Sequence, residues 1–236
     1  MRCTLVGLAA LSLAAPAGAT TMLFDFGNIA RQTALPGWNN VVYTNPDPPP
    51  PLETVVDSTG ANVPGVSLAI TDQFFINGQP SQIGSESPSG DAAAYPVDAT
   101  DDYFFGHTGP FAGAEDNPTG AITLAGLDQG LAYDFRFFSA RNGVNDSRET
   151  AFSVVGANSA SGVNVTSNND SEVLSLPGVF PDANGEITVT VSAGPGNDNG
   201  NAFYYINVMQ VDFIPEPGAA TLLALAAGSF VAARRR

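Results

Sequence analysis

The chain has 236 residues, a formal net charge of −15 and only 13% charged residues, and its eight basic residues are all arginine. Four of them lie at the chain ends, so the acidic middle excludes binding to nucleic-acid phosphates. The single cysteine, Cys3, excludes disulfides and thiol chemistry from the rest of the chain. The 25 glycines and 18 prolines predict frequent turns, which favours an all-β fold over long helices.

Residues 1–19 have the pattern of a secretion signal. Arg2 precedes an apolar run, and the segment ends in Ala17-Gly18-Ala19, a small-x-small cleavage site. The alternative is a buried first helix, but Pro16 and Gly18 interrupt the segment where such a helix would continue. We therefore expect a signal helix, export through the Sec translocon, and cleavage by signal peptidase after Ala19.

Residues 20–214 consist of short apolar or alternating runs separated by turn clusters, the pattern of a single β-sandwich domain. Tyr133, Phe135 and Phe137 share one face of a run, as half-buried antiparallel strands require. The runs predict strands at 22–26, 40–43, 66–75, 121–124, 133–140, 151–155, 172–176, 186–191 and 203–213.

The last of these runs changes parity. Ile206 and Val208 have one parity, whereas Met209 and Val211 have the other. The change predicts either a β-bulge near Val208 or a central strand that is buried on both faces.

Residues 215–236 have a three-part order. Pro215-Glu216-Pro217 is followed by the uncharged run 218–233, about 24 Å long as a helix, and then by Arg234, Arg235 and Arg236. This order resembles the PEP-CTERM sorting signal of Gram-negative bacteria. The resemblance implies a C-terminal hydrophobic helix that is held transiently in the inner membrane, and cutting near Pro215 by an exosortase. The alternative is a plain single-span anchor.

Two short stretches, LFDFG at 23–27 and GWNNV at 37–41, resemble the opening of galactose-binding-like jelly-roll domains of exported bacterial proteins. The resemblance implies a jelly-roll sandwich. In such carbohydrate modules a structural calcium commonly joins the start of the domain to its last strand, which implies Asp25 and Asp212 as its ligands. The competing interpretation places both residues at strand edges that face solvent. No other cofactor is expected.

Glycan binding needs aromatic faces and polar groups for hydroxyls. Trp38, the only tryptophan, follows Pro36-Gly37, and Arg141 and Arg148 flank a predicted turn. We expect these three residues to contact a ligand, although core packing of the aromatic residues is the competing interpretation. For the arginines the competing role is ion pairing, with Asp134, Asp146 and Glu149 as the available partners.

No catalytic constellation is found in the sequence. The only histidine, His107, lies in the turn-like segment GHTGP and is expected to be an exposed loop residue. Carboxylates are numerous enough for glycoside hydrolysis, but the sequence does not supply their separation; the candidates are Asp98, Asp101, Asp102, Glu115 and Asp116.

The leading hypothesis is a non-catalytic protein of the cell surface or extracellular matrix that associates with exopolysaccharide. The alternatives are a carbohydrate-active hydrolase and a calcium-stabilised adhesive structural protein.

Overall fold

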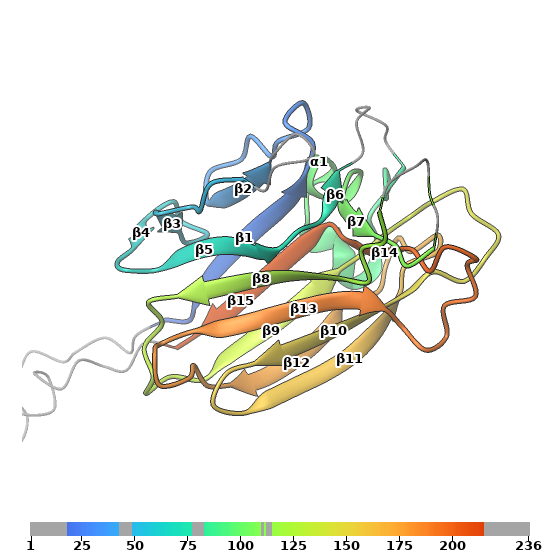
Figure 1. The fold of residues 1–236 in the computed structure, drawn as a ribbon. Coiled ribbons are helices and arrows are strands. Elements are labelled where there is room, and N and C mark those ends of the chain that lie inside the picture. The colour runs from blue at the N-terminus through green and yellow to red at the C-terminus, as the bar shows by residue number, and fades with distance from the viewer. Residues whose placement is uncertain (1–17, 43–48, 77–82, 110, 112–114, 215–236) are drawn as a thin grey trace, which may run out of the picture. The chain divides into compact units, whose positions relative to one another are not determined.

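The computed structural model describes residues 18–42, 49–76, 83–109, 111 and 115–214 (Figure 1). Thr20–Phe213 forms one compact unit in which two five-stranded sheets lie face to face. This arrangement confirms the expected all-β sandwich. The expected signal helix and C-terminal hydrophobic helix fall outside the described residues. Among the residues that are described, no helix is long and apolar enough to cross a membrane.

Sheet A contains the two ends of the domain. Its strands are, in spatial order, β12 (Leu174–Val179), β9 (Tyr133–Phe138), β15 (Val208–Phe213), β1 (Thr20–Gly27) and β2 (Trp38–Val42). The pairing of β1 with β2 is parallel and the other pairings are antiparallel.

Sheet B is antiparallel throughout. It consists of β11 (Ser159–Val165), β10 (Glu149–Val155), β13 (Ile187–Ala193), β8 (Thr119–Ala125) and β5 (Ser67–Asp72). The chain passes from β8 in sheet B to β9 in sheet A and back to β10, and again from β11 through β12 to β13. This alternation between two packed sheets is the jelly-roll arrangement that the sequence resemblance implied.

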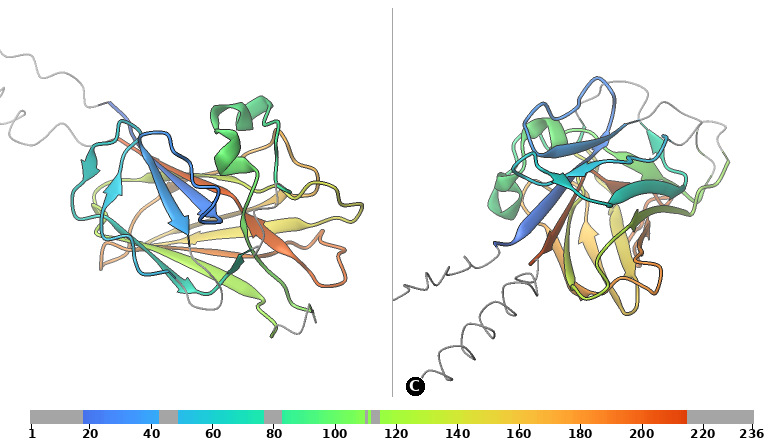
Figure 2. Two further views of the ribbon diagram at one scale, coloured as in Figure 1. Left: turned by 90° about the horizontal axis from the view of Figure 1, so that it is seen from above. Right: turned by 90° about the vertical axis from the view of Figure 1, so that its left-hand side faces the viewer.

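Short elements complete the domain. They are a three-stranded sheet of β14 (Tyr204–Ile206), β7 (Phe104–Gly106) and β6 (Phe75–Ile76), a hairpin of β3 (Val55–Val56) and β4 (Asn62–Val63), the 3₁₀ helix η1 (Gly90–Ala94) and the helix α1 (Val97–Thr100). In Figure 2 both short helices lie on one side of the sandwich.

The core follows the period-2 alternation of the strands. Tyr133, Phe135 and Phe137 of β9 are buried, and Phe137 stacks on Phe152 of the opposite sheet with ring centroids 4.4 Å apart. Burial of large apolar side chains of this kind contributes about 1.5–3 kcal/mol each. The predicted face of β9 is therefore confirmed.

The predicted strand 203–213 divides at Asn207 into β14 and β15. The Asn207 side chain is fully buried, where it accepts a hydrogen bond from the Ala140 N–H (2.8 Å) and donates to the carbonyls of Thr100 (3.0 Å) and Asp102 (2.6 Å). The parity change is thus a strand break rather than a single bulge. The other expectation, a central strand buried on both faces, is confirmed for β15: it is the middle strand of sheet A, with Met209 and Val211 in the core and Val208 covered by the segment of the short helices.

Four strands were not predicted. β3, β4 and β7 have only two or three residues each, and β11 consists mainly of small or polar residues, SASGVNV, along an edge of sheet B. An edge strand that is mostly exposed does not need an apolar face, so the alternation that reveals a strand is weak there.

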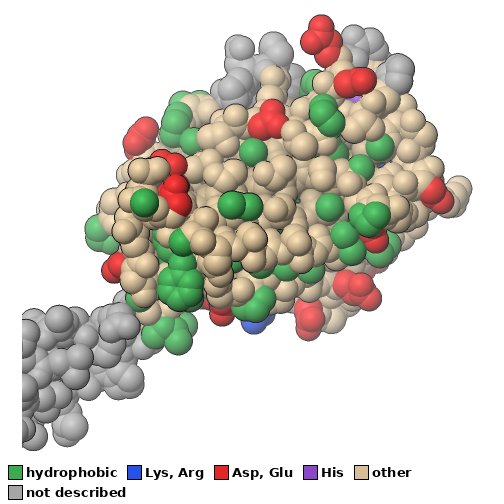
Figure 3. Space-filling model, turned by 60° about the horizontal axis from the view of Figure 1, so that its bottom comes forward, with side chains coloured by type: hydrophobic (Ala, Val, Ile, Leu, Met, Phe, Trp, Pro, Cys, Tyr) green, Lys and Arg blue, Asp and Glu red, His purple; other side chains and the backbone are tan. Residues whose placement is uncertain are grey.

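The two sheets differ on their outer faces. Ala92, Tyr95 and Ala99, from the segment that carries the short helices, pack on Phe138 and Val208 of sheet A. On sheet B, Thr71, Thr123 and Thr188 place their hydroxyls 3.1 Å apart across neighbouring strands. The face drawn in Figure 3 is mostly uncharged, with acidic side chains toward its margin.

Candidate functional site

A polar pocket of about 390 Å³ lies where loops from distant parts of the chain meet. We call it the loop-end pocket, and its lining residues are Ile83, Gly84, Glu86, Ser87, Asn142, Gly143 and Asp170. The Asn142 N–H donates to the Ile83 carbonyl (2.7 Å), and the Asn142 amide donates to Asp170 Oδ1 (3.1 Å). Asn142 Oδ1 is buried and has no hydrogen-bond partner. The pocket therefore offers the carboxylate oxygens of Glu86 and Asp170 to the hydroxyls of a ligand.

An aromatic cluster adjoins this pocket through Ile83. We use the name for Tyr103, Phe105, Phe203 and Tyr205, against which Ile83 packs. Strand pairing in the three-stranded sheet explains the cluster, because Phe105 is opposite Tyr205. The Tyr103 and Tyr205 rings meet edge to face at 4.8 Å. Tyr103, Phe203 and Tyr205 are at most 7% exposed and do not line the pocket, so the cluster supports the pocket wall through Ile83.

Arg148 joins the aromatic cluster to a carboxylate. Its guanidinium lies 5.2 Å from the Phe203 ring centroid, Nη1 donates to the Tyr205 hydroxyl (2.5 Å), and Nε donates to Asp146 (3.0 Å). Asn199 also donates to Asp146. Partial burial opposes ionisation of Asp146, but these hydrogen bonds and the guanidinium charge hold its pKa below the usual value. The expected ion pair of Arg148 is confirmed, with Asp146 as the partner.

Arg141 lies at the same end of the domain as Arg148, but within the described part of the chain its guanidinium is not paired with a carboxylate. Its Nη1 donates to the Asn142 carbonyl. Burial raises the pKa of the Tyr205 hydroxyl, and the charges of Arg148 and Arg141 offset only part of this increase. Among the described residues, no carboxylate oxygen lies within 4.0 Å of the Arg141 guanidinium. The ion pair considered for this residue does not form there.

Trp38 lies elsewhere, which corrects the expected set of ligand contacts. It is the first residue of β2, is partly buried, and meets Tyr95 edge to face at 6.2 Å. β15 and β1 separate β2 from β9, the strand that leads to Arg141. Trp38, Arg141 and Arg148 therefore do not form one site, because Trp38 is used to pack the short helical segment on sheet A.

The pairing of Asp25 with Asp212 in one calcium site is wrong. In the antiparallel register Asp25 is opposite Val208, whereas Asp212 is opposite Thr21. Four residues of strand, about 14 Å, separate the two positions. Asp212 accepts hydrogen bonds from Thr21 Oγ1 (2.6 Å) and Gln210 (2.7 Å) instead.

Asp25 has another acidic neighbour, Asp102, and we call these two the buried aspartate pair. Their exposed fractions are 1% and 4%. Burial raises the pKa of Asp25 to about 7, and burial together with the Asp25 charge raises that of Asp102 to about 8. Asp25 Oδ2 accepts from the Thr33 N–H (2.9 Å), and Asp102 accepts from the Asn28 N–H.

One oxygen of each aspartate, together with Thr33 Oγ1, is buried and has no hydrogen-bond partner. An all-oxygen set of this kind is the donor chemistry that calcium prefers. No group of three or more His, Cys, Asp or Glu that could hold a metal occurs within the described residues, so further ligands would have to be hydroxyl or carbonyl oxygens. The residues present fit calcium better around Asp25 and Asp102 than around Asp212.

Two of the five carboxylates considered for hydrolysis, Asp101 and Asp102, are buried, whereas Asp98, Glu115 and Asp116 are exposed. Asp101 is fully buried and pairs with Arg31, and Asp102 belongs to the buried aspartate pair. His107 is also fully buried, which corrects the expected exposed loop residue. Its ring stacks on Phe75 at 5.1 Å, because the backbone of His107 bridges to Asn117 and turns the side chain toward the aromatic residues.

The comparisons with known proteins give only weak similarities. No protein-family model matches the chain, and no curated protein matches it. Among solved structures it is similar to TmCBM61 in complex with β-1,4-galactotriose, with 14% identity and a TM-score of 0.27, over 47% of this chain and 70% of that one.

It is also similar to the ANXUR1 extracellular domain from Arabidopsis thaliana, with 10% identity and a TM-score of 0.35, over 69% of this chain and 51% of that one. An exo-β-1,3-galactanase from Phanerochaete chrysosporium with galactose matches with 18% identity and a TM-score of 0.26, over 66% of this chain and 37% of that one. The chain thus spans about half of the plant domain and less than that of the galactanase. TM-scores this low assign neither a family nor a ligand.

Several expected signal residues lie outside the described part of the chain. They are Ala17, Pro215, Glu216, Pro217, Arg234, Arg235 and Arg236. Ala19 is described; it is exposed and immediately precedes β1. Cleavage after Ala19 and sorting at Pro215 stay predictions from the sequence.

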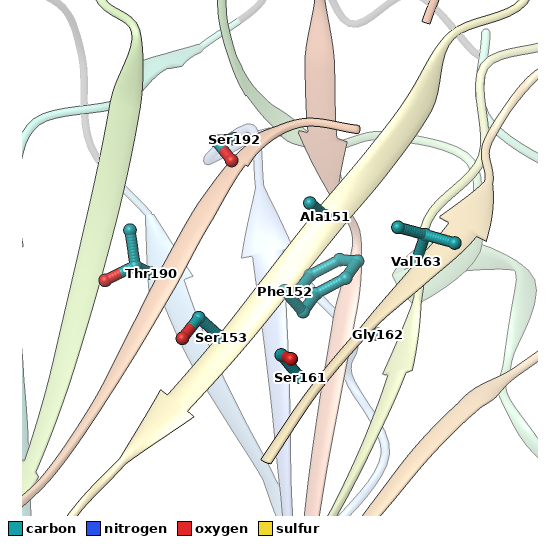
Figure 4. Close-up of a pocket in the computed structure, with 8 residues that line it drawn as sticks. All are labelled: Ala151, Phe152, Ser153, Ser161, Gly162, Val163, Thr190 and Ser192. Carbon is teal, nitrogen blue, oxygen red and sulfur yellow. The ribbon is translucent and has the colours of Figure 1, made fainter. Parts of the chain in front are cut away.

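A second, smaller pocket of about 220 Å³ lies on sheet B, between β10, β11 and β13 (Figure 4). Its side chains are small, such as Ser153, Ser161, Thr190 and Ser192. It contains no charged group and no exposed aromatic ring, since the Phe152 ring is buried in the core. The loop-end pocket is therefore the better candidate for recognition of a polar ligand.

Proposed function

We propose that this protein is a non-catalytic glycan-binding protein whose ligand occupies the loop-end pocket. The observation that carries the proposal is the convergence of the Asp170 and Glu86 carboxylates and Ser87 in one pocket formed by distant loops. Sugar hydroxyls donate to such oxygens.

The pocket is built to hold its acceptors in place. Asp170 Oδ1 accepts from Ser85 Oγ (2.5 Å) as well as from the Asn142 amide, so its position is fixed before a ligand arrives. Preorganised acceptors lower the entropy cost of binding. Glu86 and Ser87 are exposed at the pocket and supply further polar contacts.

The sequence supports the cellular setting of this proposal. The signal-peptide pattern and the Pro-Glu-Pro, apolar and arginine order favour export by the Sec translocon, transient insertion in the inner membrane and release by an exosortase. The destination is then the cell surface or the extracellular matrix, where exopolysaccharide is the available glycan.

Binding of the purified full-length chain to the host's exopolysaccharide and to a glycan panel tests this function. We expect saturable binding that Asn142→Ala and Glu86→Gln each weaken by about tenfold, the effect of about 1.4 kcal/mol. Glu53→Gln is the matched control, because Glu53 is exposed and does not line the pocket. Absence of binding to every glycan would overturn the proposal, and release of shortened sugars would favour the hydrolase alternative.

The calcium-stabilised alternative has its own observation, the unpartnered oxygens of Asp25, Thr33 and Asp102. A bound calcium would join β1 to the turn that carries Asp102 and would neutralise both carboxylates. It stabilises the folded chain by mass action if it binds only there. We expect calcium to raise the Tm and Asp25→Asn to remove that increase. A Tm that is the same in calcium and in chelator would remove this alternative.

A further inference from the structure

The four arginines in the described part of the chain differ in how their charge is balanced. Arg31 pairs with the buried Asp101, Arg148 pairs with Asp146, and Arg136 lies 3.9 Å from Asp212. Arg141 has no such partner among the described residues, although the chain has 23 acidic and only eight basic residues. An arginine left unpaired in so acidic a protein is a local positive charge that a ligand can neutralise.

Arg141 is held beside the loop-end pocket. Its Nη1 donates to the carbonyl of Asn142, and Asn142 and Gly143 line the pocket. A guanidinium has five N–H donors, and this bond is the only one that the Arg141 side chain makes within the described residues. Donors therefore remain for a ligand, and their fork geometry matches the two oxygens of a carboxylate.

Arg148 does not offer the same opportunity. Its guanidinium is already bound to Asp146 and to the Tyr205 hydroxyl, and its face is covered by Phe203. Its charge is balanced by Asp146, so of the two arginines at this end of the domain Arg141 is the one without a carboxylate partner among the described residues. The side chain of Arg141 is also partly buried, which reduces the screening of an ion pair by salt.

The pocket and the arginine beside it thus supply two kinds of group. Glu86 and Asp170 line the pocket and can accept hydrogen bonds from hydroxyls, whereas Arg141, bound to the Asn142 carbonyl next to it, can donate to an oxyanion. A neutral sugar uses only the first kind, and a simple carboxylic acid uses only the second. We propose that the pocket recognises a uronic-acid residue of an acidic polysaccharide, with its carboxylate on Arg141 and its hydroxyls on the pocket oxygens. This inference rests on the proposed glycan-binding function and adds the chemical class of the sugar.

The test compares polygalacturonate with the same polymer after full methyl esterification, which removes the charge and keeps the ring hydroxyls. Binding to the full-length chain is measured by calorimetry in chelator, so that calcium does not bridge polymer and protein carboxylates. We expect the acid to bind at least tenfold more tightly than the ester. Arg141→Gln should reduce this ratio to near one, and Arg141→Lys should retain part of it.

Arg136→Gln is the matched control, since it removes the same charge from an exposed site on sheet A. It should leave the ratio unchanged, and all three variants should keep the Tm of the parent chain. Equal binding of acid and ester would overturn the inference but leave the glycan-binding function intact. A preference for the acid that persists in Arg141→Gln would also overturn it, whereas failure of every glycan to bind would overturn the function itself.

Discussion

Two groups of polar residues at the ends of the strands show opposite ways of placing an aspartate. Asp146 accepts hydrogen bonds from Arg148 and Asn199, and its pKa is lowered. In the buried aspartate pair each carboxylate has one oxygen without a partner, and the pKa of Asp25 is raised to about 7. A carboxylate with donors is stable as an anion, whereas a buried one that lacks them needs a proton or a cation.

The largest effect is expected from removal of the residue that holds Asp102 in place. Asn207→Ala leaves the Ala140 N–H and the carbonyls of Thr100 and Asp102 buried without their partners. Since each such group costs about 1–3 kcal/mol, the free energy of unfolding should fall by about 3 kcal/mol or more. Urea denaturation measures this loss, and the exposed Asn145→Ala is the control. A loss below about 1 kcal/mol would show that the bonds are not made.

The pH dependence of stability tests the buried aspartate pair directly. Because the folded-state pKa values of Asp25 and Asp102 lie above those of the unfolded chain, the folded protein holds protons that the unfolded chain has released. In chelator, their contribution to stability is present in full below the unfolded-state pKa of about 4, decreases as the pH rises above it, and is lost once the pH has passed the folded-state values of about 7 and about 8. The expected loss over this whole range is about 2 kcal/mol or more.

Two variants sharpen the pH experiment. Asp25→Asn should flatten the profile, because the amide does not titrate and no longer repels the Asp102 charge. Asp116→Asn, at an exposed position, should leave the profile as it is. The nearby charges of Asp98, Asp101 and Arg31 are the same in every variant. Stability that increases from pH 5 to 9 in chelator would contradict the arrangement of the pair.

A smaller loss of stability is expected at Asp146, whose carboxylate has hydrogen-bond donors. Arg148→Gln removes a guanidinium that bonds Asp146 and Tyr205 and covers Phe203, and should cost about 1–2 kcal/mol. Arg141→Gln removes no ion pair within the described residues and should change stability by less than about 0.5 kcal/mol. Thermal unfolding of the two variants side by side measures the difference, and equal losses would show that the arginines are not distinct.

The smallest effect is expected for Arg136→Gln. The guanidinium lies 3.9 Å from Asp212 and its side chain is 54% exposed. A surface pair of this kind contributes between about 0 and 1 kcal/mol and is screened by salt. The variant should match the parent chain in urea denaturation at high salt. A large loss there would mean that Arg136 has a structural role that its contacts do not explain.

Much of the strand pattern was predictable from local alternation. Tyr133, Phe135 and Phe137 and the run 187–191 form buried faces because a strand that covers a core must alternate. β11 was not predicted, because its residues are small and mostly exposed at a sheet edge. The parity change at 206–209 was visible in the sequence, but its cause, the transfer of the chain from one sheet to another at Asn207, was not.

The candidate site was predictable only in part. The turn between Arg141 and Arg148 was recognised from two arginines around an Asn- and Gly-containing segment. Glu86 and Asp170 were missed, because the chain separates Ser85 from Asp170 by 85 positions and no local pattern links them. Trp38 was assigned to a ligand because tryptophan is suited to stack on sugars, yet here it packs against Tyr95.

The sequence by itself determined the all-β class, the main strands and the acidic, arginine-poor character of the domain, because these depend on composition and on neighbours along the chain. Only the tertiary structure decided which distant residues meet. The register of β1 and β15 separates Asp25 from Asp212, and the packing of the 100–102 turn brings Asp102 to Asp25 instead. Alternation fixes which face a side chain occupies, but register and loop packing fix its partners, and those depend on the whole fold.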